Sequence, residues 1–144
     1  MKVPQYITTE EVQRVCRELG IRDWTSLIEG KVPVEEARTI QAEVGAEAIH
    51  VTAEEFRRGL KVELEHGLQY PDANVTNNHP LLTGKIVLAH LKETLDYYAR
   101  LEVAELEGDI LNALSRGDPA KVGEKCRKLV HARVALSPAE AHRL

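Results

Sequence analysis

One predicted helix carries an acidic residue within its apolar face. A helix turns by about 100° per residue, so Phe56, Leu60 and Leu64 share one face. Glu63 falls inside the same arc, and His66 follows it at a spacing that places the carboxylate and the imidazole side by side. A buried carboxylate is unfavourable unless it is paired, hydrogen-bonded or bound to a metal. The Glu63-x-x-His66 pair therefore requires a partner.

The next predicted helix carries a similar pair in the reverse order. His90 lies within its apolar face, and Glu93 borders that face three residues later. Two helices joined by a loop often pack antiparallel, which could bring both pairs to one level of a bundle. We therefore expect a single cluster of four side chains: Glu63, His66, His90 and Glu93. Further candidates for this neighbourhood are Tyr97, Asp96 and His79.

Such a cluster is typical of a metal site. Glu-x-x-His pairs on bundle helices are common ligands of non-haem iron and manganese, and zinc also accepts nitrogen and oxygen ligands. We predict a divalent metal cofactor in a protein that could act as an oxidoreductase or a metal store. A carboxylate-bridged dinuclear site usually needs a second Glu-x-x-His pair, which this pattern lacks. Further ligands would then come from elsewhere in the chain or from another subunit.

Two interpretations without a metal stay open. In one, Glu63 pairs with a basic residue and His90 with a tyrosine, so that the network only fixes the register of the helices. The basic candidates are Arg57, Arg58, Lys85 and Arg100. In the other, Glu63 acts with His66 or His90 in acid–base chemistry. The spacing does not distinguish these interpretations, and it indicates no particular small-molecule substrate.

Capping and breaking residues predict the helices that position these side chains. Thr8 and Thr9 begin a first helix that stops at Gly20, and Thr52 with Glu55 forms a capping box that begins the helix carrying Glu63. A second helix is expected over 34–44, and the third helix should stop at Gly67 before a polar loop over 68–79. A fourth helix should run from Pro80 towards Ser115, with a bend or break around Thr94 to Asp96. A last helix is expected over 119–135.

We therefore expect an all-α fold, a small bundle of about five helices with the helical hairpin over 53–101 as its core. Residues 1–45 form an N-terminal helical hairpin in this scheme. Residues 46–117 form the core domain with the His/carboxylate cluster, and 118–144 form a C-terminal helix and tail.

Composition restricts the class of partner. The 144-residue chain has a formal charge of −4 and a pI of about 5.9, with no run of Lys or Arg, so we expect no nucleic acid as a partner. No run of about 18 apolar residues occurs, so we expect no membrane span. The first residues become acidic before any apolar run, which argues against a signal peptide. Cys16 and Cys126 are expected to be reduced and buried, which fits a cytoplasmic protein.

Three segments resemble a known family. They are EFRRGLKVELEHG, NVTN and TGKIVLAHLKE, followed by DYY at Asp96 to Tyr98. These resemble the motifs EFxxGLxVELEHG, NVTxDD, TGKIAxAHLxE and PDYYxxL of an uncharacterised bacterial and phage family, a domain of unknown function. Asn78 and His79 stand where acidic residues are usual in that family, and Leu95 stands where proline is usual. The resemblance implies a module and no activity.

A rival hypothesis follows from the resemblance. The chain could be a non-catalytic helical interaction or oligomerisation module of phage or mobile-element origin. Its first 45 and last 25 residues would then present helical faces to a partner. On either hypothesis we expect a homo-oligomer.

Overall fold

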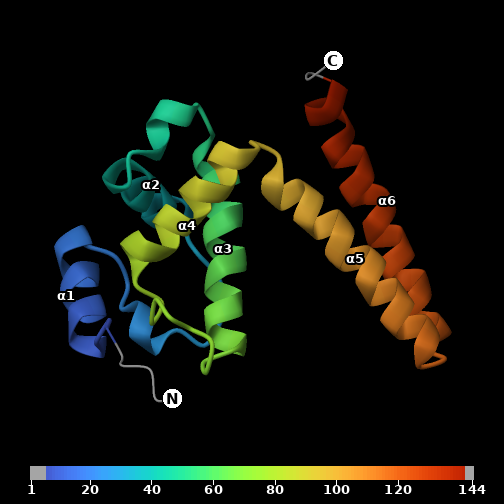
Figure 1. Ribbon diagram of the computed structural model, residues 1–144, viewed down its shortest axis with the longest axis horizontal. Coiled ribbons are helices and arrows are strands. Elements are labelled where there is room, and N and C mark those ends of the chain that lie inside the picture. The colour runs from blue at the N-terminus through green and yellow to red at the C-terminus, as the bar shows by residue number, and fades with distance from the viewer. Residues whose placement is uncertain (1–5, 142–144) are drawn as a thin grey trace. The chain divides into compact units, whose positions relative to one another are not determined.

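The computed structural model describes residues 6–141, apart from the side chains of Glu47 and Ala48. Those residues form six α-helices and two short 3₁₀ helices, and no strand occurs among them (Figure 1). The elements are α1 (Thr9–Leu19), η1 (Trp24–Ser26), α2 (Val34–Glu43), η2 (Ala46–Ile49), α3 (Ala53–Gln69), α4 (Pro80–Glu93), α5 (Tyr97–Ser115) and α6 (Pro119–Ala141). The all-α prediction is confirmed, with one α-helix more than expected.

The additional helix arises where the predicted fourth helix breaks. α4 ends at Glu93 and α5 begins at Tyr97, so the break falls at the predicted place. Asp96 stabilises the start of α5 because its carboxylate accepts a hydrogen bond from the Thr94 hydroxyl and another, 2.8 Å long, from the guanidinium of Arg100. The chain divides here into two compact units, Met1–Glu93 and Thr94–Leu144.

This division runs through the segment 46–117 that the sequence marked as one core domain. The first unit includes α2 because that helix packs against both α3 and α4. The second consists of α5 and α6, which pack against each other. Each unit is therefore described by itself.

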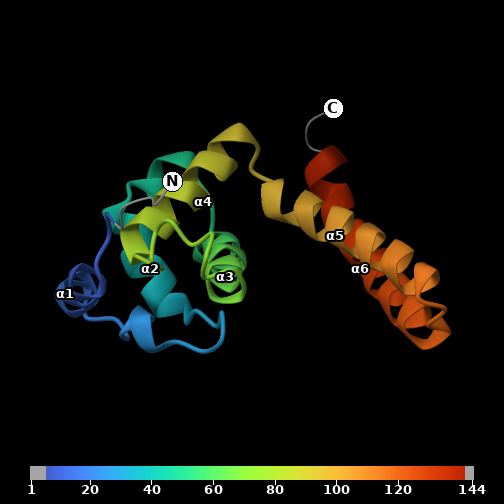
Figure 2. The ribbon, with the colours of Figure 1, turned by 60° about the horizontal axis from the view of Figure 1, so that its bottom comes forward.

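The core of the first unit lies among α2, α3 and α4 (Figures 1 and 2). Its fully buried apolar side chains include Ile40, Phe56, Leu60, Leu64 and Val87. α4 approaches α2 closely at Gly84, where an added β-carbon would lie 2.7 Å from the Ile40 side chain. This glycine permits the close packing that fixes the position of α4, and with it the position of His90.

The predicted capping residues at the starts of α1 and α3 form hydrogen bonds in the structure. The Thr52 hydroxyl accepts a hydrogen bond from the Glu55 backbone, and the Glu55 carboxylate accepts one from the Thr52 backbone, which completes the capping box of α3. At the start of α1 the Thr8 hydroxyl accepts a hydrogen bond from the Glu11 backbone, and Gly20 ends that helix with a φ of 65°. Left-handed backbone of this kind is accessible to glycine without a steric penalty.

Two helices extend further than predicted. α3 continues through Gly67 to Gln69, since this glycine serves a close contact with the following loop and does not end the helix. α6 continues beyond Ala135 to Ala141 with Pro138 inside it. No helix among residues 6–141 combines the length and apolar character needed to cross a membrane.

The second unit is an antiparallel hairpin of α5 and α6, joined at Gly117, whose φ of 65° allows the tight turn. Its buried seam includes Leu106 and Ala113 from α5 and Ala132 and Leu136 from α6. Figures 1 and 2 both show the two helices side by side along their length.

The two cysteines differ in environment, although both are free thiols. Cys16 is buried on the inner face of α1, as predicted. The prediction was wrong for Cys126, which is exposed. Position 126 lies away from the face of α6 that contains Ala132 and Leu136, so packing against α5 does not cover it.

Candidate functional site

Glu63 of α3 and His90 of α4 face each other in the first unit. The Nε2 atom of His90 lies 3.6 Å from Oε1 of Glu63. The Glu63 side chain is 16% exposed and that of His90 is 31% exposed, so both are largely withdrawn from solvent. The two side chains meet because α3 and α4 pack against each other after the loop that joins them.

His66 and Glu93 have a different environment. Both are exposed, and Glu93 is the last residue of α4. His66 lies about 60° around α3 from Glu63, which is enough to turn its imidazole away from the α3–α4 contact. Within residues 6–141, no group of three or more His, Cys, Asp or Glu side chains is arranged to hold a metal ion. The structure thus brings together two of the four predicted ligands.

A surface hollow adjoins Glu63. Its volume is about 330 Å³, and it is formed by α3, the loop that follows α3 and Ile86 of α4. The lining residues are Glu63, His66, Gly67, Tyr70, Ala73, Asn74, Val75, Thr76 and Ile86. The α3 side therefore carries a carboxylate and an imidazole, whereas the polar groups of Asn74 and Thr76 are bonded to each other within the loop. The carboxylate and the imidazole could orient a small polar ligand beside the Glu63–His90 pair.

The loop wall of this hollow is held by Asn74. Its amide nitrogen donates to the Gly67 carbonyl at 3.2 Å and to the Asn78 side-chain oxygen at 2.8 Å. Its amide oxygen accepts from the Thr76 hydroxyl at 3.1 Å and from the Asn78 backbone at 3.3 Å. Asn78 and its neighbour Asn77 have φ values of 55° and 49°, a left-handed conformation that asparagine adopts more readily than most residues. The NVTN segment is therefore a hydrogen-bonded structural loop.

His79 caps α4. Its Nδ1 accepts hydrogen bonds from the backbone N–H groups of Leu81 and Leu82, at 3.2 and 3.4 Å, which requires this nitrogen to be unprotonated. Burial lowers the pKa of His79 below its ordinary value, although the carboxylate of Glu11, 4.0 Å from Nε2, acts in the opposite direction. The side chain of His79, named above as a further candidate for the cluster, is thus engaged at the start of α4.

Asp96 and Tyr97 belong to the second unit. Asp96 is buried and is the residue before α5. The ring of Tyr97 packs edge-on against that of Tyr98, with centroids 5.1 Å apart and an interplanar angle of 75°. In that unit Asp96 thus lies at the start of α5, and Tyr97 forms an aromatic contact.

Sequence reasoning missed a buried carboxylate at Glu36. Its oxygens accept hydrogen bonds from the backbone and guanidinium of Arg22 and, at 3.2 Å, from the indole of Trp24. Burial acts to raise the pKa of Glu36, but the hydrogen bonds from Arg22 and Trp24 together outweigh it and hold the pKa below its ordinary value. A signal was present, because Glu36 precedes the core residue Ile40 by four positions and so shares its helix face.

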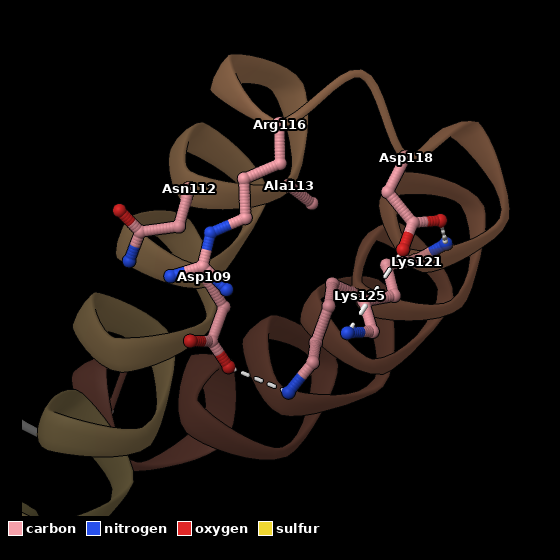
Figure 3. Close-up of a pocket in the computed structure, with 7 residues that line it drawn as sticks. All are labelled: Asp109, Asn112, Ala113, Arg116, Asp118, Lys121 and Lys125. Carbon is pink, nitrogen blue, oxygen red and sulfur yellow. Dashed lines mark hydrogen bonds and ion pairs between the residues drawn. The ribbon is translucent and has the colours of Figure 1, made fainter.

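A second hollow, of about 270 Å³, lies at the turn between α5 and α6 (Figure 3), and no sequence pattern had indicated it. Its residues are Asp109, Asn112, Ala113, Arg116, Asp118, Lys121 and Lys125. Lys125 reaches across from α6 to pair with Asp109 of α5 at 2.5 Å, and Lys121 lies 3.9 Å from Asp118. Two carboxylates thus offset much of the charge of the three cations, which makes this hollow a junction that holds the hairpin together.

Comparisons with known proteins give a family and no activity. The family model described as "Protein of unknown function (DUF5661)" matches residues 12–107, which is two thirds of the 144-residue chain. This match includes the Glu63–His90 pair and ends within α5. No curated protein and no solved structure matches the chain.

Proposed function

The chain belongs to the DUF5661 family of proteins of unknown function, and from its own residues we propose that its first unit binds a divalent metal ion between Glu63 and His90. The 3.6 Å separation of His90 Nε2 and Glu63 Oε1 carries this proposal. That distance exceeds the roughly 2.7–3.2 Å of an ordinary hydrogen bond. Two ligands at about 2.1 Å from a tetrahedral ion stand about 3.4 Å apart, close to the spacing observed.

The environment of the pair supports the same proposal. Both side chains are largely withdrawn from solvent, and a carboxylate attracts a cation more strongly there than it does in water. They also project from two helices that pack directly against each other. An imidazole with a carboxylate suits zinc, manganese or iron.

The proposed site has two protein ligands, so other groups must complete the coordination. The hollow beside Glu63 gives access for water or for a ligand with its own oxygen donors. His66 lines that hollow and could add a third ligand, the second nitrogen, by a change of side-chain rotamer. A site with open positions favours an exchangeable or reactive metal, such as that of an oxidoreductase, over a closed structural metal.

The test is a metal titration followed by thermal unfolding, on protein purified without chelator or nickel resin. An ion that binds only the folded state raises the midpoint temperature in proportion to the logarithm of its concentration. We expect zinc, manganese or ferrous iron to raise the midpoint of the wild type. Glu63→Gln and His90→Gln should abolish this increase, because each removes one of the two ligands while nearly keeping its volume.

Glu65→Gln is the matched control. Glu65 is exposed two residues from Glu63, so its replacement should leave the metal response unchanged. His66→Ala and Glu93→Gln report whether the other two predicted ligands join the site when metal is present. A wild type that no divalent metal stabilises, with pair variants that are only less stable, would contradict the proposal. The pair would then be a structural contact, as the interaction-module hypothesis requires.

A further inference from the structure

The hollow beside Glu63 has an apolar rim. Tyr70 and Val75 line this hollow and are 52% and 85% exposed, so two large apolar side chains stand open to solvent at one place. Ala73 and Ile86 add further apolar lining. Single exposed apolar residues are ordinary on a protein surface, whereas a group of them around a concave site with charged residues is typical of a ligand-binding pocket.

The rim belongs to a loop whose backbone is held by hydrogen bonds. The N–H of Tyr70 donates to the His66 carbonyl at 2.9 Å. The N–H groups of Ala73 and Val75 donate within the loop, to the carbonyls of Tyr70 and Ala73, at 3.0 Å each. The Asn74 side chain ties the same loop to α3. Because the loop is already ordered, its side chains can contact a ligand with little further loss of backbone entropy.

The charged groups of the hollow lie on α3. The Glu63 carboxylate and the His66 imidazole line it, whereas the polar groups of Asn74 and Thr76 are bonded to each other. An imidazole has at least one N–H donor in both its neutral and its protonated form, so His66 can donate to an anionic oxygen. The hollow therefore joins a charged end beside the Glu63–His90 pair to an apolar rim.

The charge of the metal site indicates the head group of the ligand, and this step rests on the proposed metal binding between Glu63 and His90. A divalent ion held by one carboxylate and one neutral imidazole keeps one uncompensated positive charge. Both side chains are largely withdrawn from solvent, where such a charge is unfavourable. A monoanion would neutralise it, and two neighbouring oxygen donors on that anion would fill two open coordination positions.

We propose that the hollow binds a small carboxylic acid with a hydroxyl or keto oxygen on the adjacent carbon and an apolar side chain. The two oxygens coordinate the metal ion at Glu63 and His90, and His66 donates to the carboxylate. The apolar side chain of the acid packs against Tyr70 and Val75 at the rim. The volume of about 330 Å³ lies at the lower end of the roughly 300–1,000 Å³ of small-molecule sites, which suits an acid of this size.

The test is equilibrium dialysis of the full chain in two stages. Zinc binding is measured first without any organic acid, and zinc-loaded protein is then dialysed against 2-hydroxyisocaproate, lactate or isocaproate. Lactate has the same head group with only a methyl side chain, and isocaproate has the same apolar chain without the hydroxyl. We expect 2-hydroxyisocaproate to bind at least about tenfold more tightly than either, because it alone combines both features. Zinc-free protein should bind none of them, since Glu63 repels an anion when no cation is present.

Val75→Ser and Tyr70→Ser test the apolar rim. Both side chains are exposed, so their replacement should leave the fold and zinc binding unchanged. Each variant should reduce the preference for 2-hydroxyisocaproate over lactate by about threefold or more, because part of the apolar contact is lost. Ile28→Ser is the matched control. Ile28 is an exposed apolar residue of the same unit that lines a different hollow, so its replacement should leave the preference unchanged.

The two stages separate failure of this inference from failure of the proposed function. No zinc binding in the first stage would contradict the metal site and this inference with it. Zinc that binds, with 2-hydroxyisocaproate held no more tightly than lactate, would overturn the inference alone. The same conclusion follows if zinc-free protein binds the acid equally well, or if Ile28→Ser changes the preference as much as Val75→Ser and Tyr70→Ser. It also follows if the acid only removes zinc, which dialysis detects because bound zinc and bound acid are measured together.

Discussion

Asn78 occupies the space that a side chain at Gly67 would need. A β-carbon added to Gly67 would overlap Oδ1 of Asn78 and would lie 3.0 Å from the amide nitrogen of Asn74. These two asparagines are hydrogen-bonded to each other, and Asn74 is also bonded to the Gly67 carbonyl, so they cannot withdraw freely. The glycine inside α3 and the loop after it are therefore one packed structure.

We predict that Gly67→Ala lowers the free energy of unfolding by about 1–3 kcal/mol, because the overlap outweighs the higher helix propensity of alanine. Gly108→Ala is the matched control. Gly108 is also inside a helix, and its β-carbon would meet no atom within 4 Å, so alanine there should stabilise by about 0.5–1 kcal/mol. Urea unfolding of both variants checks this, and equal effects would show that the loop yields to the added methyl group.

The Arg22–Glu36–Trp24 contact gives a second prediction. Glu36→Gln should lower the free energy of unfolding by about 1–2 kcal/mol, since the buried Trp24 indole and the partly exposed Arg22 guanidinium lose their charged acceptor. Glu35→Gln changes an exposed neighbour and should stay within about 0.5 kcal/mol of the wild type.

The effect of Glu36→Gln should also depend on pH. The pKa of Glu36 is lowered on folding, so its contribution is present above the unfolded pKa of about 4.3 and is lost as the pH falls through the folded value. The difference between wild type and Glu36→Gln in urea unfolding should therefore shrink in acid. A difference that stays constant down to the folded pKa would mean that the charge of Glu36 does not stabilise the fold.

His79 should make stability depend on pH in a higher range. Burial lowers its pKa on folding, against the attraction of Glu11 and with a smaller effect of Arg14 in the same direction as burial. Below the unfolded pKa of about 6.5 the unfolded chain then binds more protons than the folded chain, so stability falls as the pH falls. His79→Asn keeps a residue able to cap α4 and removes this proton linkage.

Urea unfolding on both sides of pH 6.5 checks the prediction for His79. Relative to His79→Asn, the wild type should lose stability as the pH falls from about 8 to about 5. His131→Asn, at an exposed position of α6, serves as the control and should leave the wild-type pH profile unchanged. Parallel profiles for wild type and His79→Asn would argue against a buried neutral imidazole.

The capping box of α3 gives a local prediction. Thr52→Ala should lower the free energy of unfolding by about 1 kcal/mol, because the Glu55 backbone N–H loses its acceptor at the helix start. Thr39→Ala removes a hydroxyl that bonds back to the Glu35 carbonyl inside α2, where alanine is at least as favourable, so stability should change by less than about 0.5 kcal/mol. Thermal unfolding of the two variants compares a cap with an ordinary helical position.

Features that depend on neighbours in the chain could be predicted from the sequence. The starts of α1 and α3 follow from Thr8 and Thr52, and the break between α4 and α5 falls at Thr94 to Asp96. The apolar face that contains Glu63 also follows from spacing alone. These features depend on hydrogen bonds between residues three or four apart and on helical periodicity, and both are encoded locally.

Features that depend on how the helices pack could not be predicted from the sequence. Helical periodicity made Glu63, His66, His90 and Glu93 nearly equal candidates for metal ligands. In the structure only Glu63 and His90 of these four face each other. That choice depends on the rotation and level of α4 against α3, which the close approach at Gly84 helps to fix. The same holds for the burial of Glu36 against Arg22. The sequence by itself determined the helices and the side chains able to do chemistry, whereas tertiary packing decided which of them meet, because those contacts join residues far apart in the chain.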